Sequence, residues 1–141
     1  MSFYLDASAI IPLILRDAHT INMEQWLANA REDLVVSDFA ALEVAAVISR
    51  QVRMARMSEQ KASLALALLD DWIARASTSI KTDAFDIALA DRFVRDFATK
   101  LAAPDALHLA IASNRGYRLA TFDTRLAEAA AMRGVRVVEL G

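Results

Sequence analysis

Cysteine is absent from the 141-residue chain, which excludes disulfides, thiolate catalysis and sulfur-ligated zinc or iron. Histidine occurs only 2 times, so any metal ion would have to be bound mainly by oxygen. No uninterrupted apolar run approaches the roughly 18 residues that span a bilayer, and Asp6 stands where a signal peptide would have a basic region. We therefore expect a cytoplasmic protein with no membrane partner.

Glycine and proline are also scarce, at 3 and 2 residues, and no flexible linker or internal repeat interrupts the sequence. Together with the length, this predicts a single domain over residues 1–141. The 56% hydrophobic content includes 29 alanines and therefore indicates many helices. A net charge of -2 excludes bulk electrostatic binding of DNA, so any contact with nucleic acid has to be local.

Apolar runs and helical periodicity alternate along the chain. Strands are expected at residues 3–5, 34–36, 79–81, 118–121 and 135–138. Helices are expected at residues 8–15, 20–30, 37–57, 58–74, 83–98, 104–114 and 126–132, with Ser8, Thr20, Ser37, Ser58 and Asp83 as N-terminal caps. Strands separated by helices predict an α/β fold, a three-layer α/β/α domain with a mostly parallel four- or five-stranded sheet.

Four acidic residues occupy unusual places in this pattern. Asp6 closes the first strand, and Asp123 lies just beyond the fourth. Glu43 has apolar neighbours at helical spacing, and Asp105 lies in the first turn of the helix that contains Pro104. Because ligands of open parallel sheets bind outside the carboxyl ends of the strands, we expect these acids to share one site.

Carboxylates that converge at one edge of a sheet repel one another unless hard divalent cations neutralise them. Ligation by oxygen alone selects magnesium or manganese over zinc. Such a site is typical of the metal-assisted attack of water on a phosphodiester.

Each acid also has a purely structural interpretation. Asp6 could cap a helix, and Asp105 could stabilise its helix by interacting with the helix dipole in the first turn. Asp123 could be an ordinary loop residue, and Glu43 could lie in solvent at the edge of its helix. The joint placement of the four acids favours the metal site.

Two other phosphate chemistries are conceivable. A phosphatase with Asp6 as nucleophile would need a second aspartate two residues later, where the chain has Ser8. A phospho-receiver domain would be expected to have a lysine after a late strand, and none follows Lys100. Both remain alternatives to a metal-dependent nuclease.

Four strings carry a family resemblance: residues 4–9 (YLDASA), 37–44 (SDFAALEV), 104–110 (PDALHLA) and 119–123 (LATFD). Together they resemble the PIN-domain ribonucleases, and more narrowly the VapC toxins of type II toxin–antitoxin systems. The resemblance implies a PIN-like fold and an endoribonuclease that depends on Mg²⁺ or Mn²⁺ and cleaves RNA as a toxin. A catalytically silent RNA-binding module of the same fold is the alternative.

The resemblance also implies roles for individual residues and the identity of the partners. It makes Asp6, Glu43, Asp105 and Asp123 the metal-binding catalytic set, with Ser8 and Thr121 in support. It implies a homodimer. It also implies a VapB-like antitoxin that binds in an apolar groove, with operator DNA contacted only through the antitoxin. Candidate groove residues are Met23, Trp26, Leu27, Val44, Val47 and Ile48.

Several polar residues remain outside this set. Arg50 follows Glu43 by about 10 Å along the same helical face and is a candidate phosphate contact, with Arg53 and Arg56 extending a basic stripe. His108 shares a helical face with Asp105 but is expected to belong to the helix rather than to the chemistry. The remaining aspartates are interpreted as helix caps or solvent-facing charges: Asp70, Asp71, Asp83, Asp86, Asp91 and Asp96.

Overall fold

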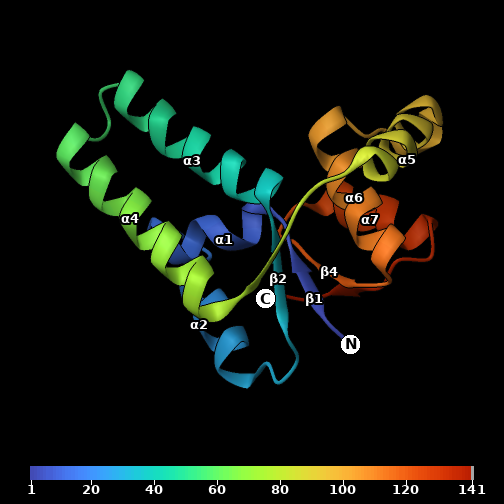
Figure 1. Ribbon diagram of the computed structural model, residues 1–141, viewed down its shortest axis with the longest axis horizontal. Coiled ribbons are helices and arrows are strands. Elements are labelled where there is room, and N and C mark those ends of the chain that lie inside the picture. Colours follow the sequence, from blue (N-terminus) through green and yellow to red (C-terminus); the bar gives the residue numbers. More distant parts are fainter. Residues whose placement is uncertain (141) are drawn as a thin grey trace.

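Five short parallel strands form one sheet at the centre of the computed structural model, which describes residues 1–140 (Figure 1). In chain order the strands are β1 (Phe3–Leu5), β2 (Leu34–Ser37), β3 (Thr78–Ile80), β4 (Arg118–Ala120) and β5 (Val137–Val138). The helices are α1 (Ala7–Ile14), α2 (Thr20–Asn29), α3 (Asp38–Arg53), α4 (Glu59–Ala76), α5 (Ala84–Arg95), the 3₁₀ turn η1 (Phe97–Thr99), α6 (Ala103–Arg115) and α7 (Thr124–Met132). The expected α/β class and mostly parallel sheet of four or five strands are confirmed, with five strands that are all parallel. The predicted domain extends to Gly141, which lies outside the described residues.

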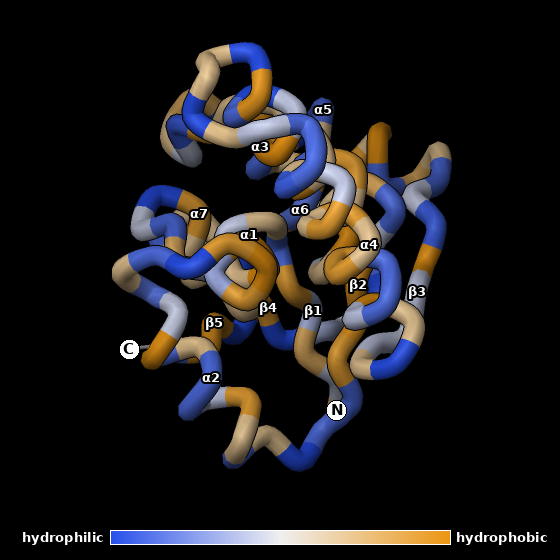
Figure 2. The backbone as a smooth tube through the Cα atoms, turned by 90° about the vertical axis from the view of Figure 1, so that its left-hand side faces the viewer, coloured by the Kyte–Doolittle hydropathy of each residue, from blue (hydrophilic) through white to orange (hydrophobic). Residues whose placement is uncertain are grey.

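Helices cover both faces of the sheet, as the alternating side chains of a buried strand require. Phe3 and Leu5 of β1 pack into a core with α1–α4, whereas Tyr4 between them packs on the opposite face with α5–α7. Figure 1 shows these two helical layers on either side of the strands, with the antiparallel pair α3 and α4 extending outward. Figure 2 shows hydrophobic colouring along β2, β4, β5 and α1.

In the strand order β3-β2-β1-β4-β5, successive strands are added on one side of β1 and then, from β4 on, on its other side. The point where the strand order reverses therefore lies between β1 and β4. Leu5 is in register with Ala120, so the segments that follow β1 and β4 leave the sheet side by side. The carboxyl ends of β1, β2 and β4 therefore deliver the starts of α1, α3 and α7 to one edge. Ligand sites of open parallel sheets lie at such an edge.

Local hydrogen bonds shift several of the expected helix boundaries. Asp6, and not Ser8, caps α1 by accepting from the Ala9 N–H. Thr20 is the first residue of α2 and not its cap, and its hydroxyl accepts from the Asp17 N–H at 2.8 Å and donates to the Pro12 carbonyl at 2.7 Å. The helix expected over residues 83–98 ends at Arg95, where the side chain of Asp96 caps the separate turn η1.

Three of the six apolar residues expected to line an antitoxin groove lie in the core, and the other three, Trp26, Leu27 and Val47, are partly buried. Met23, Val44 and Ile48 are all 0% exposed, so they cannot anchor a partner at the surface. Their helical spacing is explained by the packing of α2 and α3 on the sheet. No helix within residues 1–140 is long and apolar enough to cross a membrane.

Asp86 is a cap, as expected, but it is not solvent-facing. Its side chain is 0% exposed, accepts from Arg115 Nη1 at 2.7 Å and Asn114 Nδ2 at 3.0 Å, and completes a capping box with Asp83. Burial acts to raise the pKa of Asp86, but the hydrogen bonds from Arg115 and Asn114 outweigh it and leave the pKa below its usual value. This ion pair ties α5 to α6.

We predict that Asp86→Ala lowers the free energy of unfolding by about 3 kcal/mol at pH 7, because the Arg115 guanidinium loses its buried partner and is left with the longer ion pair to Asp83 at 3.5 Å. The contribution of Asp86 is present above its unfolded pKa of about 4 and is lost as pH falls through the lower folded pKa. Urea unfolding at pH 7 and pH 3 should show the gap between wild type and variant narrowing in acid. Asp71→Ala removes the exposed pair with Arg75 and should cost under about 0.5 kcal/mol.

Candidate active site

The four predicted acids line one cavity of about 440 Å³ at the carboxyl edge of the sheet. Asp6 follows β1, Glu43 lies in the second turn of α3, Asp105 lies in the first turn of α6, and Asp123 follows β4. The cavity wall also contains Ser8, Ile11, Val47, Arg50, Arg53 and His108. The structure thus brings together every candidate catalytic residue and the candidate phosphate contact.

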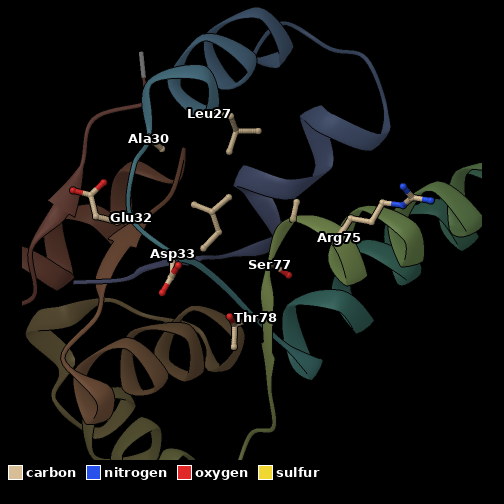
Figure 3. A pocket seen from close by; sticks show the side chains of 9 residues that line it. Leu27, Ala30, Glu32, Asp33, Arg75, Ser77 and Thr78 are labelled. Atoms are coloured by element: carbon tan, nitrogen blue, oxygen red, sulfur yellow. The ribbon is translucent and has the colours of Figure 1, made fainter.

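A second cavity of similar volume, about 400 Å³, lies at the opposite edge, by the amino ends of β2 and β3 (Figure 3). It contains the acidic residues Glu32 and Asp33, but Figure 3 shows Arg75 extending away from them along α4. Arg75 pairs instead with Asp71 at 2.8 Å. The charged groups of this cavity do not converge, so it lacks the chemistry of the acidic cavity.

Asp6 is the most deeply buried of the four acids, with 3% of its surface exposed. Its Oδ1 accepts from the Ser8 hydroxyl at 2.7 Å and the Ala9 N–H at 3.1 Å, and its Oδ2 accepts from the Thr121 hydroxyl at 2.6 Å. Burial raises the pKa of Asp6, against the opposing effects of His108 and the two hydroxyls. The carboxylate is therefore fixed in orientation while its negative charge is poorly solvated.

Thr121 and Ser8 connect Asp6 to the segment that carries Asp123. The Thr121 oxygen accepts from the Asp123 N–H at 2.9 Å, and the Ser8 oxygen accepts from the Phe122 N–H at 2.9 Å. Asp123 itself caps α7 by accepting from the Leu126 N–H at 2.9 Å. Both hydroxyl residues thus lie where they can support the acidic site.

Asp105 shows most clearly the electrostatic cost of this convergence. Its pKa is raised to about 6, first by burial and then by the negative charge of Asp123, with smaller contributions from Asp6 and Glu43. A carboxylate in such a place is stabilised by a nearby cation.

Glu43 forms a hydrogen bond with His108, a residue that was expected only to pack within its helix. Its Oε1 is bonded to Nε2 of His108, which is 2% exposed. The spacing of Asp105 and His108 placed both on one face of α6, but it gave no sign that His108 would meet a side chain of α3.

A divalent cation fits this site by donor chemistry, since all four acids offer oxygen and their mutual repulsion would be relieved by positive charge. Within residues 1–140, no three acidic or histidine side chains are already gathered closely enough to hold a metal ion. Asp6 is bonded to hydroxyls and Glu43 to His108. Binding a cation would therefore require side-chain movements within the cavity.

The fold and site define an α/β protein with a carboxylate cluster where a parallel sheet reverses its order. A family profile described as PIN domain matches residues 3–132. Ribonuclease VapC3 from Pyrobaculum aerophilum is 30% identical over 128 residues, covering 91% of this chain and 94% of that protein. The chain therefore belongs to the PIN-domain family and is VapC-like, as the sequence motifs predicted.

Solved structures share this fold. The Mycobacterium tuberculosis VapC20 structure, described as a Sarcin-Ricin loop cleaving toxin, has a TM-score of 0.72 at 18% identity, covering 90% of this chain and 94% of that one. A DNA-bound VapBC structure from Salmonella typhimurium has a TM-score of 0.72 at 17% identity, covering 100% and 99% of the two chains. At these identities the likeness establishes the fold.

We predict that Asp105→Asn stabilises the metal-free protein by about 1 kcal/mol at pH 7–8, less than the full pKa shift implies because the side chain is partly solvated. The folded pKa is raised, so wild-type stability falls relative to the variant as pH rises from about 4 to 7. Below pH 4 the gain should vanish. Thermal or urea unfolding across this pH range measures the difference in stability, and Asp70→Asn, at an exposed position, serves as the control. An Asp105→Asn variant less stable than the wild type at pH 7 would contradict the repulsion among the acids.

Proposed function

We propose that this protein is a metal-dependent endoribonuclease that acts as the toxin of a toxin–antitoxin pair. The observation that carries the proposal is the convergence of Asp6, Glu43, Asp105 and Asp123 on one cavity at the carboxyl edge of a PIN-domain sheet. The similarity of this chain to Ribonuclease VapC3 supports cleavage of RNA as the reaction.

The four acids would hold one or two Mg²⁺ or Mn²⁺ ions. When bound, such ions activate water and stabilise negative charge on the phosphate under attack. The chain itself contributes orientation: Ser8 and Thr121 hold Asp6, while the backbone of α7 holds Asp123. No side chain of the cavity is required as a nucleophile.

Arg50 and Arg53 give the acidic cavity a basic rim. Both lie on α3, both line the cavity, and both are exposed. Arg50 donates only weakly, to Met54 Sδ at 3.4 Å, which leaves its guanidinium available to a phosphate. A locally basic rim allows RNA to approach a protein whose net charge is -2.

We also propose a VapB-like antitoxin as partner, with operator DNA bound through the antitoxin. Structures described as DNA-bound VapBC from Salmonella typhimurium and as a toxin–antitoxin complex from Klebsiella pneumoniae support this assembly. Exposed apolar side chains that could contact a peptide lie on α3 and α4, including Leu42 at 63% and Leu64 at 71% exposure. The homodimer implied by the family resemblance stays a prediction.

Asp6→Asn should reduce cleavage of a structured RNA at least a hundredfold in the presence of Mn²⁺, because it removes a charge from the cation site. The fold should persist, since an asparagine oxygen can still accept from the Ala9 N–H and cap α1. Gel analysis of RNA fragments measures the activity, and the rise in Tm on adding Mn²⁺ gives a second readout.

Wild-type protein in EDTA and the Asp70→Asn variant in Mn²⁺ serve as the controls for this test. The first should be inactive, and the second should cleave like the wild type. A wild-type protein that binds RNA without cutting it would instead identify a silent RNA-binding module. Undiminished cleavage by Asp6→Asn would overturn the assigned site.

Arg50→Ala is expected to raise the KM for RNA several-fold while changing kcat less, because the guanidinium contacts substrate phosphate outside the reacting group. The salt dependence of RNA binding should also weaken by about one charge. Arg56→Ala is the matched control, since Arg56 is exposed just beyond α3 and outside the cavity. Equal effects of the two substitutions would argue against a specific phosphate contact.

A further inference from the structure

A chain of side-chain hydrogen bonds runs beneath the acidic cavity through residues that are distant in sequence. The Tyr4 hydroxyl lies 2.8 Å from Ser37 Oγ and 2.6 Å from His108 Nδ1, and His108 Nε2 contacts Glu43 Oε1. Tyr4, Ser37 and His108 are all buried, with at most 2% of each exposed. We call Ser37, Tyr4, His108 and Glu43 the polar relay.

Counting hydrogens gives the relay a direction. Ser37 Oγ accepts from the Ala40 N–H at 3.0 Å, so its own hydrogen is free to be donated to Tyr4. The Tyr4 phenol carries its proton at neutral pH, as any tyrosine does, and can donate it to His108 Nδ1 at 2.6 Å. Nε2 then carries the hydrogen that is donated to Glu43. With this assignment every hydrogen of the relay is donated. If Nδ1 carried the hydrogen instead, it would donate to Tyr4 and Tyr4 would donate to Ser37, so the Ser37 hydrogen would have no acceptor in the relay.

The relay connects the elements that carry three of the four acids. Tyr4 is in β1, two residues before Asp6. His108 is in α6, three residues after Asp105. Ser37 caps α3, the helix that carries Glu43. A shift of any one of these elements relative to the others would break a buried hydrogen bond, which is costly where water cannot replace it.

Glu43 needs such a support more than Asp6 and Asp123 do. Asp6 and Asp123 are short side chains fixed by backbone N–H groups that they cap. Glu43 projects from the second turn of α3, has a longer and more flexible side chain that is 28% exposed, and is repelled by its acidic neighbours. Without a donor it would turn toward solvent.

We infer that His108 is a positioning residue, which acts through Glu43 to keep that carboxylate facing the acidic cavity. It occupies Oε1, and within residues 1–140 no group donates to Oε2, which leaves that oxygen for a cation. Tyr4 in turn fixes the ring of His108. This inference rests on the proposed function, because it assigns His108 a role in that cation site.

A double-mutant cycle on Mn²⁺ affinity tests whether His108 acts through Glu43. His108→Phe removes the donor and should weaken Mn²⁺ binding about tenfold, as measured by calorimetry. In a Glu43→Gln background, the same substitution should have no further effect. His108→Gln, which retains a donor near the position of Nε2, should recover part of the affinity. Ile111→Val, a buried change on the same helix outside the relay, should leave Mn²⁺ binding unchanged.

Nitrogen NMR of the His108 ring tests the relay without metal or RNA. The Nε2–H form should be observed, and both Tyr4→Phe and Glu43→Gln should shift the ring resonances. This readout also serves if His108→Phe fails to fold, because Tyr4→Phe and His108→Gln preserve most of the packing.

The outcomes separate the two claims. Absence of Mn²⁺ binding by the wild type would refute the cation site of the proposed function. If the ring resonances still responded to Glu43→Gln in that case, the contact between His108 and Glu43 would nevertheless be supported. Additive losses in the cycle, or ring resonances unaffected by Glu43→Gln, would overturn the positioning role. Coupled losses together with shifted resonances would support it.

Discussion

Electrostatic repulsion among carboxylates at the carboxyl edge of the sheet is the constraint on which the rest of this structure depends. Burial and the charge of Asp123 raise the pKa of Asp105 to about 6, and burial raises the pKa of Asp6. In the metal-free protein these groups oppose folding at neutral pH. The stability they cost has to come from the two apolar cores on either face of the sheet and from buried pairs such as Asp86 with Arg115.

Two of the acids proposed to bind a cation are also helix caps. Asp6 and Asp123 are the N-caps of α1 and α7, so backbone N–H groups hold one oxygen of each carboxylate. A cap orients a carboxylate without adding a positive side chain that would compete with a cation. The interpretation of Asp6 as a helix cap is therefore confirmed, and Asp123, which was interpreted as a loop residue, is also a cap. Capping explains how the orientation of both carboxylates is fixed.

The features predictable from sequence were those in which a local pattern and a tertiary position coincide. Asp6 and Asp123 could be assigned to one edge of the sheet because each ends a strand, and parallel strands bring their carboxyl ends together. Contacts between distant elements left no local signal. Nothing in the apolar surroundings of His108 indicated a bond to Glu43, 65 residues away in sequence. The spacing of Met23, Val44 and Ile48 identified an apolar face without indicating whether the sheet or a partner covers it.

The polar relay shows why such contacts concentrate beneath the acids. A sheet edge brings Asp6 and Asp123 together through backbone register, since Leu5 pairs with Ala120. Glu43 lies a further turn along α3, and Asp105 lies on α6, which does not follow directly from a strand. Buried hydrogen bonds through Tyr4 and His108 supply a further constraint on these two helices, because they are lost when either helix shifts by a fraction of a hydrogen-bond length. The apolar packing of α3 and α6 gives stability, and the directional bonds of the relay fix the two helices relative to each other against the repulsion between Glu43 and Asp105.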